Sequence, residues 1–320
     1  MSMKMKMISV IIPVFGSPDS LNELCRRVDT ALDSYFDHSY ELILVDDGCP
    51  NNSWKKIEQL SQVYKNLVGI KLSRNFGQHF AMSAGVDEAN GECVVFMDCD
   101  LQDRPEDIIE LYEKYKSTDA QIVFARSKIR GKKTLLRQAT SKLYYWVYDY
   151  LSYNTGKSFN TSFMLMSRSV SDAFISMRES ERQFFSLINY LGFTTEFVDV
   201  EHDERFIGES SYTFWTRLQL AVKGITSNST RLLKLGVSIG ALFSSASFIY
   251  GVYLILIKLM RPETIVSGWT AIMVTTFFAS GLIILLLGIL GSYLETIFWE
   301  VKRRPYYFIE KKISRMNQDA

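Results

Sequence analysis

The sequence has almost no excess of charge of either sign. Lysine and arginine number 36 against 35 aspartate and glutamate residues, which leaves a formal net charge of +1 over 320 residues. No long run of like charge breaks this balance. Because nucleic-acid binding relies on basic patches that neutralise phosphates, the sequence predicts no nucleic-acid partner.

Cysteine is also scarce, and its spacing favours neither a disulfide scaffold nor a redox motif. The cysteines contain no Cys-x-x-Cys pair and fall at Cys25, Cys49, Cys93 and Cys99. Cys25 lies in a helical pattern and Cys93 in a strand pattern. Since disulfide frameworks belong to oxidising compartments, the sequence predicts a reduced chain that faces the cytosol.

Two common nucleotide-binding motifs are missing. Residues 14–18 form the first turn and read Val-Phe-Gly-Ser-Pro, which is neither a Rossmann glycine fingerprint nor a P-loop. Dinucleotide binding and phosphate binding by glycine amides are therefore not expected. The apolar run before this turn is short, contains Pro13 and precedes no small-residue cleavage site, so we interpret it as a first strand rather than a signal peptide.

Long apolar segments are present in the last third of the chain. Leu235–Ile257 and Thr264–Leu294 carry no charged residue, and each exceeds the roughly 20 helical residues that cross a bilayer. They predict a two-helix transmembrane hairpin, with spans at about 235–257 and 269–294. Basic residues are concentrated on the outer sides of the pair, so the positive-inside rule places both termini in the cytoplasm. We therefore expect a multi-pass protein of the inner membrane, in contact with the lipid bilayer.

The rest of the chain alternates short apolar strands with helical patterns. Strands are predicted at 8–13, 40–45, 67–72, 93–97, 121–125, 163–166 and 194–200. The strand runs are continuous rather than alternating, as in parallel strands that are covered on both faces. This pattern predicts an α/β fold with a mainly parallel, doubly wound sheet.

Pairs of aspartates follow two of these strands. Asp46 and Asp47 end the second strand, while Asp98 and Asp100 follow the fourth. The carboxyl ends of parallel strands form the usual ligand crevice of open α/β sheets. Close carboxylates repel each other unless a cation lies between them, and Mg²⁺ or Mn²⁺ completed by substrate phosphates meets that need. The alternative is that Asp98 and Asp100 only cap the helix near Pro105, which is commoner for an isolated Asp-x-Asp.

Several motifs, taken in order, resemble those of family 2 glycosyltransferases. They are Ile12-Pro-Val-Phe15, Val45-Asp-Asp-Gly48, Asn75-Phe-Gly-Gln-His79, Asp98-Cys-Asp-Leu-Gln102, and Glu204-Arg205 with Gly208-Glu-Ser210. Together with the terminal hairpin, they are most similar to the dolichol-phosphate mannose synthase-like group, which transfers sugars to polyprenyl phosphates. The resemblance spans nearly the whole chain.

This resemblance implies a GT-A fold, Rossmann-like with a mainly parallel sheet, and transfer of a sugar from a UDP-linked donor to undecaprenyl phosphate. The transfer would invert the anomeric carbon at the cytoplasmic membrane face. The expected layout is a cytoplasmic catalytic domain at 1–210, interfacial amphipathic helices at 211–232, the hairpin at 233–295 and a basic cytoplasmic tail at 296–320. The oligomeric state stays open, a homo-oligomer included.

The resemblance also implies roles for single residues. Asp98, Asp100 and Gln102 would address the metal, and Asp98 also the donor. Pro13, Phe15, Asp46 and Asp47 would bind the nucleotide. Phosphates would meet Arg126, Arg137 and Arg205, and Ser210 would lie in the acceptor loop. Catalysis would rest on Asp98, Asp100 and Arg205, although Arg205 could instead form a surface ion pair.

Two positions depart from the family pattern. Phe15-Gly16-Ser17 replaces the family's Tyr-Asn-Glu, which puts the base contacts in doubt. Thr161 stands where many relatives carry an aspartate. A phosphate monoester, whose second pKa is about 6, is already largely anionic at pH 7 and needs no general base, so the second departure favours a lipid-phosphate acceptor.

Other functions are compatible with parts of this pattern. A polysaccharide synthase shares the domain, but it carries a Gln-x-x-Arg-Trp motif, and no Arg-Trp pair occurs in this sequence. A non-catalytic membrane scaffold would explain the two departures but not the intact acidic pair. Release of UDP in the presence of undecaprenyl phosphate distinguishes these possibilities.

Overall fold

The computed structural model describes residues 8–16, 18–127, 161–177, 179, 184–201, 231–260 and 268–314. Contacts divide these residues into two compact units, which we describe separately. The first unit holds the described residues up to 127, those from 161 to 201, and 304–314. The second holds the long helices between residues 231 and 303.

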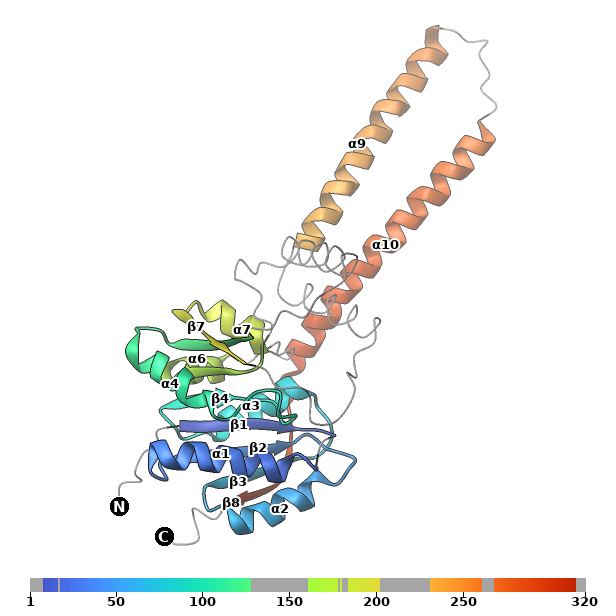
Figure 1. The fold of residues 1–320 in the computed structure, drawn as a ribbon. Coiled ribbons are helices and arrows are strands. Elements are labelled where there is room, and N and C mark those ends of the chain that lie inside the picture. The colour runs from blue at the N-terminus through green and yellow to red at the C-terminus, as the bar shows by residue number, and fades with distance from the viewer. Residues whose placement is uncertain are drawn as a thin grey trace. The chain divides into compact units, whose positions relative to one another are not determined.

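The first unit is built around one eight-stranded sheet in the order β7-β5-β6-β4-β1-β2-β3-β8 (Figure 1). Its strands are β1 (Ile8–Val14), β2 (Tyr40–Asp46), β3 (Leu67–Leu72), β4 (Cys93–Phe96), β5 (Ile122–Ser127), β6 (Met164–Ser167), β7 (Thr195–Val200) and β8 (Ile309–Ser314). The central strands β4, β1, β2 and β3 are parallel, as is the β5–β7 pair. β6 runs antiparallel to β4 and β5, and β8 antiparallel to β3.

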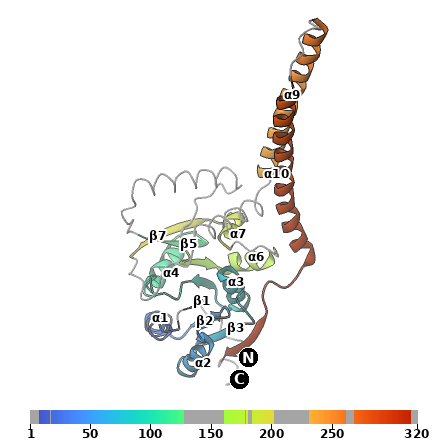
Figure 2. The same ribbon diagram turned by 90° about the vertical axis from the view of Figure 1, so that its right-hand side faces the viewer.

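Helices cover both faces of this sheet. They are α1 (Leu21–Phe36), α2 (Ser53–Val63), α3 (Gln78–Glu88), α4 (Asp107–Ser117), α6 (Arg168–Ser176) and α7 (Phe184–Leu191). In Figure 2, α1, α2 and α4 lie on one side of the strands, and α3, α6 and α7 lie on the other. Side chains of β1 alternate between the two cores, with Val10 and Ile12 in the first and Ile11 in the second. This two-sided burial explains the continuous apolar runs of the strands.

The predicted α/β class and the mostly parallel, GT-A-like sheet are confirmed. Two strands differ from expectation, since the direction of β6 and the existence of β8 were not predicted. β6 inserts antiparallel between β4 and β5. β8 lies within the segment that the sequence led us to treat as a basic tail. It reads Ile-Glu-Lys-Lys-Ile-Ser and occupies the sheet edge beside β3, where exposed lysines are typical because they discourage further strand pairing.

The second unit contains α9 (Arg231–Met260) and α10 (Trp269–Lys302). The spans predicted at about 235–257 and 269–294 therefore lie on helices, and α10 continues past Leu294 to Lys302. Within the described residues, one stretch, Phe278–Lys302, is long and apolar enough to cross a membrane. This finding supports one membrane-spanning helix, so the predicted hairpin of two spans stays a prediction.

Candidate active site

The two aspartates at the end of β2 are buried and bind backbone amides. Asp47 accepts hydrogen bonds from the amides of Phe76 and Gly77, at 2.8 and 2.9 Å, and so holds the loop between β3 and α3. Asp46 accepts one from the amide of Cys49 at 2.9 Å. Burial raises the pKa of both carboxyls, and these amide hydrogen bonds oppose the shift. Asp47 therefore holds the loop between β3 and α3 in place through these two hydrogen bonds.

Gly48 explains why a glycine follows this acidic pair. Its φ is +62°, and an added Cβ would lie 2.5 Å from the carbonyl carbon of Arg74 and from the amide nitrogen of Asn75. Any side chain would push the β2 and β3 loops apart. The Val-Asp-Asp-Gly motif thus brings two strand ends into contact at the carboxyl edge of the sheet.

Asp98 stands at the end of β4 and is held on both carboxylate oxygens. Gln78, the first residue of α3, donates from Nε2 to Oδ1 at 2.8 Å. Ser162, just before β6, donates from Oγ to Oδ2 at 2.7 Å. Both donors are neutral, so they orient the carboxylate without cancelling its charge. The sequence prediction singled out Asp98 but missed these two partners.

Ser162 also bears on the departure from the family pattern. The neighbouring Thr161 is engaged locally, since its Oγ1 accepts from the amide of Phe163 at 3.1 Å. A hydroxyl donor therefore reaches Asp98 from the residue next to Thr161, the position at which the family resemblance implies an aspartate. An additional carboxylate at that place would repel Asp98 rather than donate to it.

The chain after Asp98 makes a tight acidic turn. Asp100 Oδ1 accepts from the amide of Gln102 at 3.1 Å. Between them Leu101 is buried with φ at +62°, a left-handed conformation that is uncommon for a residue with a branched side chain and is often found at functional sites. Burial, and then the charges of Asp98 and Asp100, raise the pKa of the buried Asp103 to about 7. The turn therefore concentrates negative potential.

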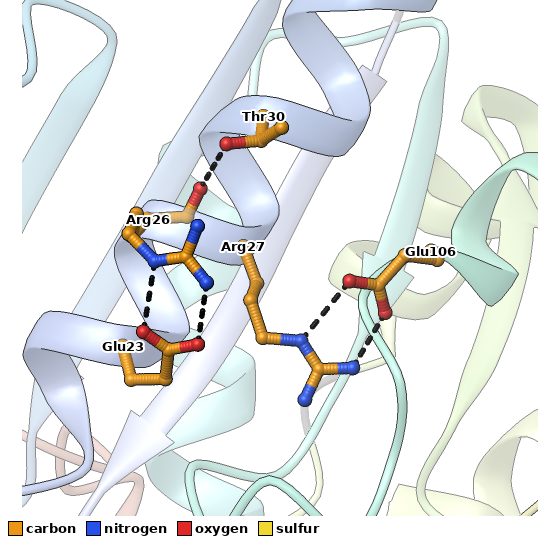
Figure 3. A network of polar contacts seen from close by, with 5 residues as sticks. All are labelled: Glu23, Arg26, Arg27, Thr30 and Glu106. Atoms are coloured by element: carbon orange, nitrogen blue, oxygen red, sulfur yellow. Dashed lines mark hydrogen bonds and ion pairs between the residues drawn. The ribbon is translucent and has the colours of Figure 1, made fainter.

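Helix α1 braces this turn at both ends. The Ser20 hydroxyl, which precedes α1, donates to the carbonyl oxygen of Cys99 at 2.7 Å. Farther along, Arg27 binds Glu106 through two hydrogen bonds, of 3.0 and 2.7 Å, and Glu106 directly precedes α4 (Figure 3). The turn that contains the left-handed Leu101 is thus attached to α1 on both sides, through Cys99 and Glu106.

A divalent cation fits this turn if protein carboxylates and substrate phosphates share its coordination, rather than protein ligands alone. Among the residues that the structure describes, no group of three His, Cys, Asp or Glu side chains is arranged to hold a metal ion. Mg²⁺ commonly takes only one or two carboxylates and completes its shell with water and substrate phosphates. Asp98 and Asp100 lie two residues apart in this turn, and their carboxylate oxygens are the kind of ligand that suits such an ion.

Phe15 and Pro13 lie at the end of β1, beside β2. Pro13 pairs in register with Val45, and Phe15 follows the strand with 51% of its surface exposed. The next residue, Gly16, donates its amide to Cys49 Sγ at 3.1 Å. The structure thus brings Phe15 near the Asp46–Cys49 turn, where an exposed aromatic ring can stack against a planar ligand.

The predicted arginines are placed only in part. Arg126 lies in β5, where Nε binds Asp199 of β7 at 2.5 Å and the guanidinium lies 5.7 Å from the Phe197 ring centroid. It is a surface ion pair in this structure. Arg137, Arg205 and Ser210 lie outside the described residues.

Comparison with known proteins gives a consistent picture. The model of the family described as "Glycosyl transferase family 2" matches residues 9–174. An uncharacterized glycosyltransferase, YkcC from Bacillus subtilis (strain 168), is 32% identical over 97% of this chain and 95% of its own. An undecaprenyl-phosphate 4-deoxy-4-formamido-L-arabinose transferase from Proteus mirabilis (strain HI4320) is 31% identical over 97% and 95%. The SfII prophage-derived bactoprenol glucosyl transferase of Shigella flexneri is 30% identical over 95% and 97%.

Among solved structures, the chain is similar to glucosyl-3-phosphoglycerate synthase from Mycobacterium tuberculosis in complex with Mn²⁺, UDP and phosphoglyceric acid. The identity is 14% and the TM-score 0.49, over 69% of this chain and 76% of that one.

Proposed function

The chain belongs to glycosyl transferase family 2, and from that premise we propose that it transfers a sugar from a UDP-linked donor to polyprenyl phosphate, with inversion at the anomeric carbon. Relatives that match this chain over nearly its whole length are named for bactoprenol and undecaprenyl-phosphate acceptors. The observation that carries the proposal is the Asp98 carboxylate, which Gln78 and Ser162 hold beside Asp100 at the carboxyl edge of the sheet.

Asp98, Asp100 and Gln102 would hold Mg²⁺ or Mn²⁺ together with the donor diphosphate. When bound, such an ion stabilises the negative charge of a departing diphosphate as a Lewis acid. The protein contributes a carboxylate whose direction is fixed before the donor arrives, because Gln78 and Ser162 bind both of its oxygens.

Nucleotide recognition would involve the end of β1 and β2. The exposed ring of Phe15 offers a stacking surface for the uracil base, and Pro13 shapes the strand end that presents it. Asp46 and Asp47 would face the base or ribose from β2. Because Asp47 already binds two loop amides, Asp46 is the stronger candidate for a direct hydrogen bond to the nucleoside.

The acceptor phosphate would itself be the nucleophile. Its anionic oxygen attacks the anomeric carbon on the side opposite the departing UDP, so one bond forms as the other breaks and the configuration inverts. No base is required, which agrees with Thr161 at the position where the family resemblance implies a carboxylate. Arg205, with Arg137 and Ser210, would bind the lipid phosphate, and Arg126 would join them only after leaving Asp199.

The acceptor's lipid tail requires contact with a bilayer, which α9 and α10 would supply as a transmembrane hairpin with both termini in the cytoplasm. The end of α10 has the character of a membrane interface. Lys302 Nζ lies 4.0 Å from the Phe298 ring centroid and 4.9 Å from that of Trp299. Aromatic rings and lysine are typical of the headgroup level, where their polar ends reach water.

The test is transfer by the full-length protein in detergent or nanodiscs. We expect UDP release from one member of a UDP-sugar panel when Mn²⁺ and undecaprenyl phosphate are both present, with a sugar-bearing lipid as product. Undecaprenol, which lacks the phosphate, is the matched control and should give no product. Equal UDP release with and without lipid phosphate for every donor would contradict the proposal.

A further inference from the structure

The chain returns to the sheet after the long helices and makes a strap along its edge. We define the C-terminal strap as residues 306–314, which comprise Tyr306, Tyr307, Phe308 and β8. The strap pairs antiparallel with β3, and the amide of Ser73 donates to the carbonyl of Phe308 at 2.9 Å. An ion pair of 2.8 Å between Lys71 and Glu310 adds to this pairing.

The same strap contacts α3 at both ends of one helical face. The Tyr306 ring stacks on Phe80, with centroids 6.4 Å apart and planes inclined by 20°. The Tyr307 hydroxyl donates to Asp87 at 2.5 Å, and Lys312 forms an ion pair with Glu88. Residues seven or eight apart on a helix lie on the same face, so these three contacts cover a single stripe of α3.

The opposite side of α3 packs tightly on the sheet. An added Cβ at Gly85 would lie 2.3 Å from Ile11 Cγ2, so the helix approaches β1 as closely as a glycine allows. Ala81, four residues before Gly85 and so on the same side of the helix, is fully buried in the same core. α3 is therefore confined between the sheet on its inner side and the strap on its outer side.

The position of α3 matters because its first residue reaches the candidate active site. Gln78 donates to Asp98, and the loop before it is held by Asp47. Phe80, which Tyr306 covers, lies in the same helical turn as Gln78, whereas Glu88 ends the helix. The strap also affects the charge around Asp46, since Lys71 lowers and Glu310 raises the pKa of that carboxyl.

We propose that Tyr306 is a positioning residue, which fixes the first turn of α3 so that the Gln78 amide stays on the Asp98 carboxylate. For its activity readout this inference rests on the proposed function. A small shift of a positioning group is enough to lower turnover, because reacting groups must be held within a fraction of an ångström. The chain segment that follows the last long helix would thereby take part in the active site without touching the substrate.

A double-mutant cycle in the full-length protein tests this. Tyr306→Leu keeps an apolar side chain but removes the stacked ring, and we expect kcat to fall about 10-fold while the dissociation constant for UDP with Mn²⁺ stays within about 2-fold. Tyr307→Phe removes a hydroxyl that bonds Asp87 near the end of the helix, far from Gln78, and should change kcat by less than about 2-fold. Lys312→Ala, at the far end of the same stripe, is the matched control and should change kcat by less than about 2-fold.

The cycle then asks whether Tyr306 acts through Gln78. If it does, Tyr306→Leu causes little further loss in a Gln78→Ala background, because the group that it positions is already gone. Equal losses in both backgrounds would overturn the proposal. So would losses that follow the melting temperature across all three strap variants, or a Gln78→Ala protein with wild-type kcat.

Hydrogen exchange separates this inference from the proposed function. The amides of the first turn of α3, in residues 78–82, should exchange faster in Tyr306→Leu than in wild type. In Lys312→Ala their exchange rates should equal those of the wild type. A wild-type protein that transfers no sugar would contradict the proposed function alone. Unchanged exchange in Tyr306→Leu would contradict the strap's positioning role, whatever the activity.

Discussion

Buried carboxylates lie at both ends of the central strands, but the groups that surround them differ. At the amino ends, Glu41 accepts hydrogen bonds from the Ser9 hydroxyl at 2.6 Å and from the Asn90 amide at 2.5 Å. The amide of Gly91 in turn donates to the Ser9 hydroxyl at 2.8 Å. This closed network ties β1, β2 and the approach to β4 together.

At the carboxyl ends, Asp98, Asp100 and Asp103 crowd into one turn, and the pKa of Asp103 is raised to about 7. Two neutral side chains hold Asp98, and a left-handed leucine follows it. The difference teaches how to distinguish a structural from a functional acid. Glu41 and Asp98 both accept hydrogen bonds from side chains or amides, but Asp98 shares its turn with two further acids, and the charges of Asp98 and Asp100 contribute to the raised pKa of Asp103.

The largest effect should come from the acidic turn. Asp100→Asn keeps the shape of the side chain but removes its charge, so we expect turnover to fall by about 1,000-fold as a metal ligand is lost. The melting temperature should hardly change, and EDTA should have the same effect on the wild type. A variant with normal turnover would show that Asp100 is no ligand.

The next effect concerns the acceptor. Arg205→Lys keeps the charge and loses the two-pronged geometry, so kcat/KM for lipid phosphate should fall about 10- to 150-fold, equivalent to roughly 1.5–3 kcal/mol. Steady-state kinetics with varied lipid phosphate and varied donor provide the measurement. If donor binding weakens and the lipid kinetics do not change, the arginine belongs to the donor site.

A smaller effect of the opposite kind is expected at the amino ends. Glu41→Gln keeps one acceptor oxygen for the Ser9 and Asn90 donors but removes the negative charge that strengthens these hydrogen bonds, so stability should fall by about 2 kcal/mol in denaturant unfolding. Turnover per folded molecule should be retained, because no step of the reaction involves this edge. Ser61→Ala, in a buried position of α2, is a control for the general effect of removing a buried polar group.

The last effect is a pH dependence of the folding stability at Asp103. Its folded-state pKa of about 7 lies above the ordinary value of 3.8, so the folded protein binds the proton more tightly than the unfolded chain. Stability should therefore fall as the pH rises from about 4 to 7. Asp103→Asn should remove this fall, which amounts to roughly 1.4 kcal/mol for each unit by which folding raises the pKa, as measured by unfolding curves across that range. An identical slope in the variant would show that Asp103 does not titrate there.

The sequence predicted the central sheet well because two-sided burial leaves a strong signal. The strand predicted at 67–72 coincides with β3, and the strand predicted at 40–45 lies within β2. β8 was missed for a physical reason. Its sequence is charged, and it forms a strand only because β3, far away in the chain, offers an open edge.

The acidic turn was predictable in part. Asp98 and Asp100 stand out because acids follow a buried strand, but Gln78 and Ser162 reach Asp98 from other elements, and no local pattern marks them. Asp47 shows the converse. A motif position expected to bind nucleotide proves to hold the amides of a neighbouring loop, which only the three-dimensional arrangement reveals.

The most direct measurement compares the two edges in one assay. Initial rates of sugar transfer to undecaprenyl phosphate are determined for Asp98→Asn and Glu41→Gln, each normalised to the folded fraction. We predict a loss of more than about 100-fold for Asp98→Asn and a rate within about 2-fold of wild type for Glu41→Gln. Comparable rates for the two variants would contradict the assignment of the carboxyl edge as the active site.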